Sequence, residues 1–200
     1  LPDIIQLWDP GANRPYVRSL YLNKGDGTGW TTEHNYDLSN LPIFLYGSGN
    51  DMGVRIADIN GDGLPDIIQL WDPGTYRKTL YLNKGDGTGW TTEHNYDVSN
   101  LPIFTYGAGS DMGTRIVDTN GDGLPDIIRL WDPADDRPYV KNLYLNKGDG
   151  TGWTTEHNYD LSNLPIFFYG CQNDMGVRIA DVNGDGLPDF VQLIYFSDNT

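Results

Sequence analysis

The chain is poor in cysteine, in basic residues and in long apolar runs, and each shortage narrows what it can do. Cys171 is the one cysteine among 200 residues, so no internal disulfide can form. Lys and Arg number 13 against 28 Asp and Glu, which gives a formal net charge of −15. A chain this acidic repels phosphate backbones, which argues against nucleic acid as a partner. No apolar run reaches the roughly 18 residues of a membrane-spanning helix, so the sequence predicts no membrane span.

Recognisable catalytic motifs are also missing. Neither HExxH nor GxSxG occurs, and these are patterns that place a metal ligand or a nucleophile for hydrolysis. His34, His94 and His157 lie next to glutamates in three copies of Thr-Thr-Glu-His-Asn. One active site per copy would be unusual, so we interpret them as partly exposed strand residues. The sequence predicts a protein that is not an enzyme, and a hydrolase is the least supported hypothesis.

What the chain does contain is an internal repeat. LPDIIQLW begins at Leu1 and recurs, with small changes, at Leu64, Leu124 and Leu187, which gives spacings of 63, 60 and 63 residues. LYLNKGDGTGWTTEHNYD occurs three times without a change, starting at residues 20, 80 and 143. A fixed period of this length indicates a repeat architecture. We expect one repeat array over residues 1–200, with repeats at about 1–63, 64–123 and 124–186 and an additional closing or next-blade strand within 187–200.

Each repeat predicts about four short strands. The expected strands in the second repeat are Ile67–Trp71, Thr79–Asn83 and Trp90–Tyr96, with Thr114–Val117 leading into the next repeat, and Gly-rich turns separate them. The segments alternate or are rich in β-branched residues and show no helical period. Four short strands per roughly 60 residues are typical of one propeller blade. The predicted fold class is therefore all-β, with β-propeller blades of about four short antiparallel strands, as a partial propeller or a ring completed by oligomerisation.

Three complete acidic loops follow the pattern Asp-x-Asn-Gly-Asp-Gly-Leu-Pro-Asp, and Asp3 is the expected last acid of a fourth. If a loop coils tightly, the side-chain oxygens at positions 1, 3, 5 and 9 and the carbonyl at position 7 converge. Ca²⁺ takes six to eight such oxygens in flexible geometry, whereas Mg²⁺ requires a strict octahedron. The glycines at positions 4 and 6 allow the backbone turns that coiling requires. The predicted Ca²⁺ ligands are Asp58, Asn60, Asp62, Leu64 and Asp66; Asp118, Asn120, Asp122, Leu124 and Asp126; and Asp181, Asn183, Asp185, Leu187 and Asp189.

Two alternative interpretations of the loops fit the sequence less well. Asp, Asn and Gly favour turns by themselves, but three copies that retain every acid favour metal binding. An EF-hand needs a Glu at position 12 and flanking helices, whereas position 12 here is Gln69, Arg129 or Gln192 and the flanks are strand-like. Three bound Ca²⁺ ions would move the formal charge from −15 to −9, because they bring six positive charges.

The segment from Tyr46-Gly through Asp-Met-Gly-Val-Arg-Ile-Ala to the Asp58–Asp66 loop resembles the FG-GAP repeat, also called the VCBS repeat. This repeat builds the β-propeller of integrin α subunits and of many secreted bacterial proteins. The resemblance covers nearly the whole chain and implies one calcium ion per loop, on the ligands given above. The chain departs from the family where Trp-Asp-Pro replaces Gly-Ala-Pro after the loop's strand. An integrin-specific ligand site is therefore not expected.

Two functional hypotheses follow from this resemblance. The first is a calcium-stabilised extracellular module, secreted or on the cell surface, for adhesion or for protein–protein recognition and scaffolding. The second is a carbohydrate-binding lectin propeller with one site per blade, in which Trp8, Trp71 and Trp131 stack on sugar rather than pack between blades. A propeller needs about four to eight blades. We therefore expect either self-association or membership of a longer chain, with a protein or glycan as ligand.

Overall fold

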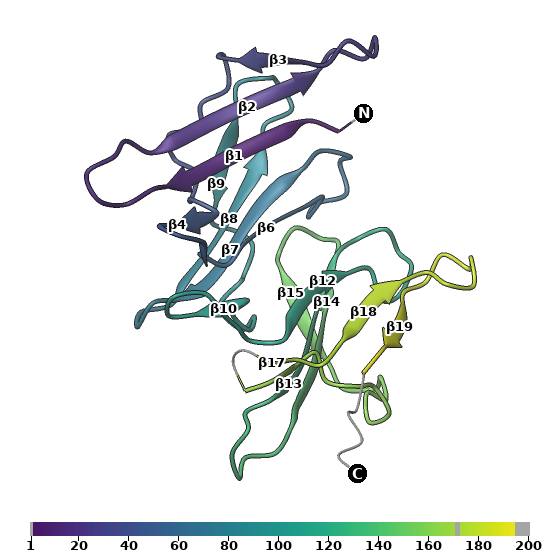
Figure 1. Ribbon diagram of the computed structural model, residues 1–200. Helices are drawn as coiled ribbons and strands as arrows, with labels where there is room; N and C mark the ends of the chain where they lie inside the picture. Colours follow the sequence, from purple (N-terminus) through teal and green to yellow (C-terminus); the bar gives the residue numbers. More distant parts are fainter. Residues whose placement is uncertain (1, 171–172, 195–200) are drawn as a thin grey trace.

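The computed structural model describes residues 2–170 and 173–194, so Cys171 lies outside the described residues. This part of the chain forms strands, turns and loops and contains no helix. Figure 1 shows four small sheets that succeed one another from the N-terminal to the C-terminal end of the chain. The prediction of an all-β fold made of repeated sheets of short strands is confirmed.

The first sheet has the strand order β3-β2-β1-β4-β5. Its long strands β1 and β2 are antiparallel, and β3 continues the antiparallel ladder beside β2. The two-residue strand β4 runs parallel to the end of β1, where Trp8 lies opposite Leu45. The bounds are β1 (Ile4–Asp9), β2 (Val17–Asn23), β3 (Trp30–Glu33), β4 (Leu45–Tyr46) and β5 (Asn50–Asp51).

The second and third sheets repeat this order and add one strand. In the second sheet β6 pairs with the start of β7, and β10 pairs with the end of β7. In the third sheet β12 and β16 do the same to β13. The bounds are β6 (Val54–Ala57), β7 (Asp66–Asp72), β8 (Arg77–Asn83), β9 (Trp90–Glu93), β10 (Thr105–Tyr106) and β11 (Ser110–Asp111); then β12 (Thr114–Val117), β13 (Asp126–Asp132), β14 (Val140–Asn146), β15 (Trp153–Glu156), β16 (Phe168–Tyr169) and β17 (Asn173–Asp174).

The fourth sheet is the pair β18 (Val177–Ala180) and β19 (Asp189–Gln192). Of the closing segment expected within 187–200, residues 195–200 lie outside the described residues. The sheets share the sequence period but begin elsewhere, at Val54, Thr114 and Val177. Each complete acidic loop therefore lies inside a sheet, between its first two strands.

The core runs between successive sheets as well as within them. One cluster joins the second sheet to the third through buried residues such as Ile59, Phe104, Ile127 and Trp153. Parallel backbone bridges at the strand edge, Asp37 with Gly89 and Asp97 with Gly152, connect neighbouring sheets at equivalent places. The sheets therefore depend on one another for burial, as the small blades of a repeat protein do.

Candidate metal centres

Every complete acidic loop closes an antiparallel hairpin. Ala57 pairs with Asp66 at the base of the first loop, and the second and third loops are closed by Val117 with Asp126 and by Ala180 with Asp189. The first and last acids of each loop are thus held on opposite strands at the same end of one β-ladder. The hairpin predicts their proximity whether or not an ion is bound.

The first loop coils around the carboxylate of Asp58. Its Oδ1 accepts hydrogen bonds from the N–H groups of Gly61 at 2.9 Å and Asp62 at 3.0 Å. Its Oδ2 accepts from Gly63 at 2.8 Å. Gly61 and Gly63 have φ of 76° and 84°, a region that side chains other than glycine rarely adopt. The two glycines are therefore what permits the tight coil that the sequence predicted.

Asn60 and Asp62 lock the middle of the same loop. The side-chain Nδ2 of Asn60 donates to Asp62 Oδ2 at 2.9 Å, while the Asp62 N–H donates to Asn60 Oδ1 at 3.1 Å. Asp62 Oδ1 accepts from the N–H of Leu64 at 2.8 Å. Positions 1, 3 and 5 thus form one hydrogen-bonded group, in which Asn60 and Asp62 are exposed and Asp58 is half-buried.

Asp66, the last acid, lies at the buried floor of the loop. It is fully buried, and its two oxygens accept from Ile59 N–H at 3.0 Å and Asn83 N–H at 2.8 Å. Burial, together with the nearby carboxylates of Asp62 and Asp58, raises the pKa of Asp66 to about 6. The structure therefore places three acids close enough to repel one another, which is the arrangement that a cation relieves.

The second and third loops repeat this geometry, but the contacts and the burial of their last aspartate differ. Asp126 accepts from the backbone and hydroxyl of Thr119 and from Asn146 N–H, and burial raises its pKa. Asp189 accepts from Val182 N–H at 3.0 Å and is only half-buried. The coil around the first acid is the same in both, through Asp118 and Asp181.

The oxygen atoms of the loop side chains suit a hard cation. In this structure the first aspartate of each loop accepts hydrogen bonds from backbone N–H groups instead. Within residues 2–170 and 173–194, no three His, Cys, Asp or Glu side chains converge as a metal cluster. Each loop supplies four side chains with oxygen donors and one backbone carbonyl, and no nitrogen or sulfur ligand. Hard oxygen donors with adjustable spacing suit Ca²⁺. The fifteen ligand assignments stay a prediction.

The tryptophans considered for sugar stacking are held by local contacts. The indole N–H of Trp8, Trp71 and Trp131 donates to a glycine carbonyl of its own sheet, at 3.1, 2.9 and 2.5 Å. A guanidinium lies about 6 Å from each ring, from Arg14, Arg77 and Arg137 respectively. Trp8 and Trp71 are half-buried and Trp131 is buried. Their ligand-binding role stays a prediction.

Two residues that the sequence did not single out contact the loops directly. Ile59, at position 2 of the first loop, is fully buried against the third sheet. Asn146, at the end of β14, donates from Nδ2 to the Ile59 carbonyl at 2.9 Å. The LYLN segment that contains Asn146 occurs unchanged in all three repeats, so its sequence gave no signal that one copy crosses to another sheet.

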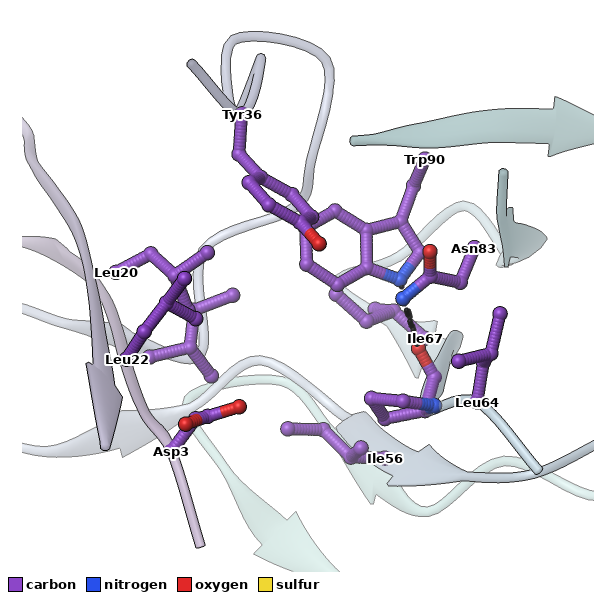
Figure 2. A pocket seen from close by; sticks show the side chains of 11 residues that line it. Asp3, Leu20, Leu22, Tyr36, Ile56, Leu64, Ile67, Asn83 and Trp90 are labelled. Atoms are coloured by element: carbon purple, nitrogen blue, oxygen red, sulfur yellow. Dashed lines mark hydrogen bonds between the residues drawn. The ribbon is translucent and has the colours of Figure 1, made fainter. Parts of the chain in front are cut away.

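Between the first and second sheets a pocket of about 400 Å³ remains open. Figure 2 shows Tyr36 and Trp90 on one side and Asp3 and Ile56 on the other, with the Asn83 side chain donating to the carbonyl of Pro65. The lining is mostly apolar.

No helix in the described part of the chain has the length and apolarity needed to cross a membrane. The three histidines of the Glu-His-Asn segments, His34, His94 and His157, are exposed.

The known proteins similar to this chain include a curated relative and a solved structure. The T-cell immunomodulatory protein homolog of Plasmodium yoelii yoelii is 30% identical over 144 residues, which is 68% of this chain and 19% of that protein. The chain thus spans about a fifth of the length of this relative. An Agrocybe aegerita lectin, described as recognising non-reducing terminal N-acetylglucosamine, aligns with a TM-score of 0.49 and 17% identity over 94% of this chain and 42% of the lectin chain. At this TM-score and identity, the lectin supports no conclusion about the function of this chain.

The family is shown by the match to a family model. The model of the FG-GAP-like repeat matches residues 1–68 and 118–191. These ranges cover well over half of the chain and include the first sheet, the third sheet except β12, and all three complete acidic loops. The chain belongs to the FG-GAP-like repeat family.

Proposed function

We propose that this chain is a calcium-stabilised β-propeller module that serves extracellular adhesion or protein recognition and has no catalytic activity of its own. The observation that carries the proposal is the repeated loop. Three copies of the same oxygen-rich sequence each close a hairpin and coil around their first aspartate. Turn formation alone would not require an acid at positions 1, 5 and 9 of every copy.

The extracellular assignment follows from the expected affinity. Sites of this kind in extracellular modules bind Ca²⁺ with dissociation constants of about 10⁻⁴–10⁻³ M. Such sites fill at the millimolar calcium outside cells and are empty at cytosolic levels. At about ten-fold saturation each site would contribute about 1.4 kcal/mol, so three would give on the order of 4 kcal/mol. That is a large share of the stability of a typical domain.

The deciding experiment is a thermal melt in millimolar Ca²⁺ and in excess EGTA, with light scattering after size exclusion to give the oligomeric state. We expect the melting temperature to rise clearly in Ca²⁺ and to rise less in Mg²⁺. Asp62→Ala should lower stability in Ca²⁺ more than in EGTA, because the first loop loses one ligand. Equal losses in the two conditions, or no shift for the unmodified chain, would remove the metal from the proposal and with it the argument for an extracellular role.

Self-association is the second part of the same proposal. Large apolar side chains are exposed in the loop of the fourth sheet and directly after β19, with Val182 at 65% and Leu193 at 81%. Isolated exposed residues are common, but repeat arrays bury such surfaces against a further repeat. We expect a defined oligomer in light scattering, or a monomer once further repeats are supplied in the same chain.

A lectin remains the second candidate, and one observation favours it. A pocket of about 450 Å³ lies between the second and third sheets and is lined by Tyr76, Tyr106 and Trp131, with Arg129 and Arg137 beside them. Tyr76 and Tyr106 are 67% and 50% exposed, and exposed aromatic faces suit the apolar face of a sugar. A glycan array separates the two candidates: repeated weak binding that is lost in Trp71→Ala and Trp131→Ala would favour the lectin.

A further inference from the structure

The three copies of the LYLN segment place chemically identical asparagines in different contacts. Asn23 Nδ2 and Asn83 Nδ2 each donate to a proline carbonyl of their own sheet, Pro2 and Pro65, at 3.4 Å. Asn146 Nδ2 instead donates at 2.9 Å to the carbonyl of Ile59, which belongs to the preceding sheet. Asn146 is 5% exposed, so this bond between two sheets is shielded from water.

Ile59 connects that bond to Asp66, the last acid of the first acidic loop. Its N–H donates to Asp66 Oδ2 at 3.0 Å, and its carbonyl accepts from Asn146. Its side chain is fully buried in the cluster that contains Ile127 and Trp153 of the third sheet. The backbone of Ile59, and therefore the peptide bond that leads to Asn60, is fixed from both sides.

Asn146 continues the path to the second acidic loop. Its own N–H donates to Asp126 Oδ1 at 2.9 Å. An unbroken series of contacts thus runs from Asp66 through Ile59 and Asn146 to Asp126. It joins the last acid of one loop to the last acid of the next, in a buried setting where hydrogen bonds are strong and expensive to leave unmade.

We propose that the first and second acidic loops are energetically coupled through Asn146, so that Ca²⁺ held by either loop raises the affinity of the other. The inference rests on the proposed calcium function and assigns Asn146 as a positioning residue, since it contacts no predicted ligand atom except through its backbone bond to Asp126. Ordering either loop fixes Ile59 and Asn146, and the second loop then loses less conformational freedom on binding. Such coupling is reciprocal and is typically five-fold or larger.

The third loop has different surroundings in the described part of the chain. The position equivalent to Ile59 is Val182, whose side chain is 65% exposed. The fourth sheet, as described, is a single strand pair without a counterpart of β14. No side chain of another sheet in the described part of the chain reaches the third loop as Asn146 reaches the first. The path through Ile59 and Asn146 therefore does not extend to the third loop in the described part of the chain.

The test uses a background in which only the coupled pair remains. Asp185→Ala removes the third loop's central ligand, and calorimetric titration with Ca²⁺ then reports two ions. We expect the second ion to bind about five-fold or more tightly than the first after statistical correction. Adding Asn146→Ala should leave two ions bound but make them independent. Adding Asn83→Ala, the matched control, should retain the coupling, because Asn83 bonds within its own sheet.

The outcomes separate failure of this inference from failure of the proposed function. Absence of Ca²⁺ uptake by the unmodified chain would overturn the calcium function itself. Two ions that bind independently, or with the second weaker, in the Asp185→Ala background would overturn the coupling alone. Retained coupling in Asn146→Ala would overturn the role of Asn146. If that variant does not fold, as judged by circular dichroism, Asn146→Ser is the substitute, and the measurement in the Asp185→Ala background still decides whether coupling exists.

Discussion

At the scale of single residues, one glycine per repeat allows the segment just before the first strand of a sheet to contact the central strand of that sheet. Gly113 has φ of +66°, and its carbonyl accepts from Leu130 N–H at 2.9 Å. A Cβ added to Gly113 would lie 2.6 Å from the Leu130 carbonyl oxygen. Gly53 makes the same approach to Leu70 in the second sheet. Both the backbone conformation and the available space therefore require glycine here.

Replacing this glycine should be far more damaging than replacing one with the same backbone conformation and open surroundings. Gly113→Ala combines left-handed backbone strain with a backbone clash, and we expect a loss of about 2–4 kcal/mol in the free energy of unfolding. Gly107→Ala is the matched control, because its φ is +56° and an added Cβ would meet nothing within 4 Å. The control should lose only about 1–2 kcal/mol. Urea denaturation measures both, and equal losses would show that the clash is relieved by movement of β12.

At the scale of elements, strands of identical sequence lie in different surroundings. The Trp-Thr-Thr-Glu strands β3, β9 and β15 begin with Trp30, Trp90 and Trp153, whose exposed fractions are 46%, 5% and 2%. Trp90 and Trp153 pack against Tyr36 and Tyr96 of the preceding repeat. The first copy has no preceding sheet in the described part of the chain. Neighbouring sheets, rather than the strand's own sequence, therefore decide its burial.

This difference predicts unequal effects of the same substitution. In Trp153→Phe the buried carbonyl of Pro125 loses the indole N–H that now donates to it at 3.0 Å, and the smaller ring leaves a void. We expect a loss of about 2–3 kcal/mol. Trp30→Phe removes the equivalent bond to Pro2, at 3.1 Å, where water can replace it, so its loss should stay below about 1 kcal/mol. Denaturant unfolding with unchanged slope checks the pair, and equal losses would mean that Trp30 is covered in solution.

The same contrast shows what sequence reasoning could and could not reach. The alternating residues and Gly-rich turns predicted the strands at β7, β8 and β12, and the loop spacing predicted the coil around Asp58. The expected strand Trp90–Tyr96 ends at Glu93, because the Glu93 carboxylate accepts from Asn95 N–H and turns the chain. The two-residue strands such as β10 were not predicted, since they form by pairing with the end of a distant strand. The contact of Asn146 with Ile59 spans 87 residues, and no local pattern encodes it.

At the scale of the whole molecule, charge is the property that most distinguishes this chain. The formal net charge is −15, and nine of the acidic groups belong to the three complete loops. Like charges at this density destabilise a compact state by self-repulsion. Bound Ca²⁺ would reduce the formal charge to −9 and would do so where the acids are most crowded.

Salt should therefore partly substitute for calcium. Raising NaCl from about 0.01 M to about 0.15 M shortens the screening length from about 30 Å to about 8 Å, which weakens repulsion among the loops. We expect the melting temperature in excess EGTA to rise over this range and to rise less, or fall, in saturating Ca²⁺, because most of the loop charge is then already neutralised and salt competes with ion binding. Choline chloride serves as the control, since it screens charge without a small cation that could enter the loops. If the melting temperature depends on salt equally with and without Ca²⁺, the repulsion resides outside the loops, and metal binding would stabilise the array by its coordination geometry rather than by its charge.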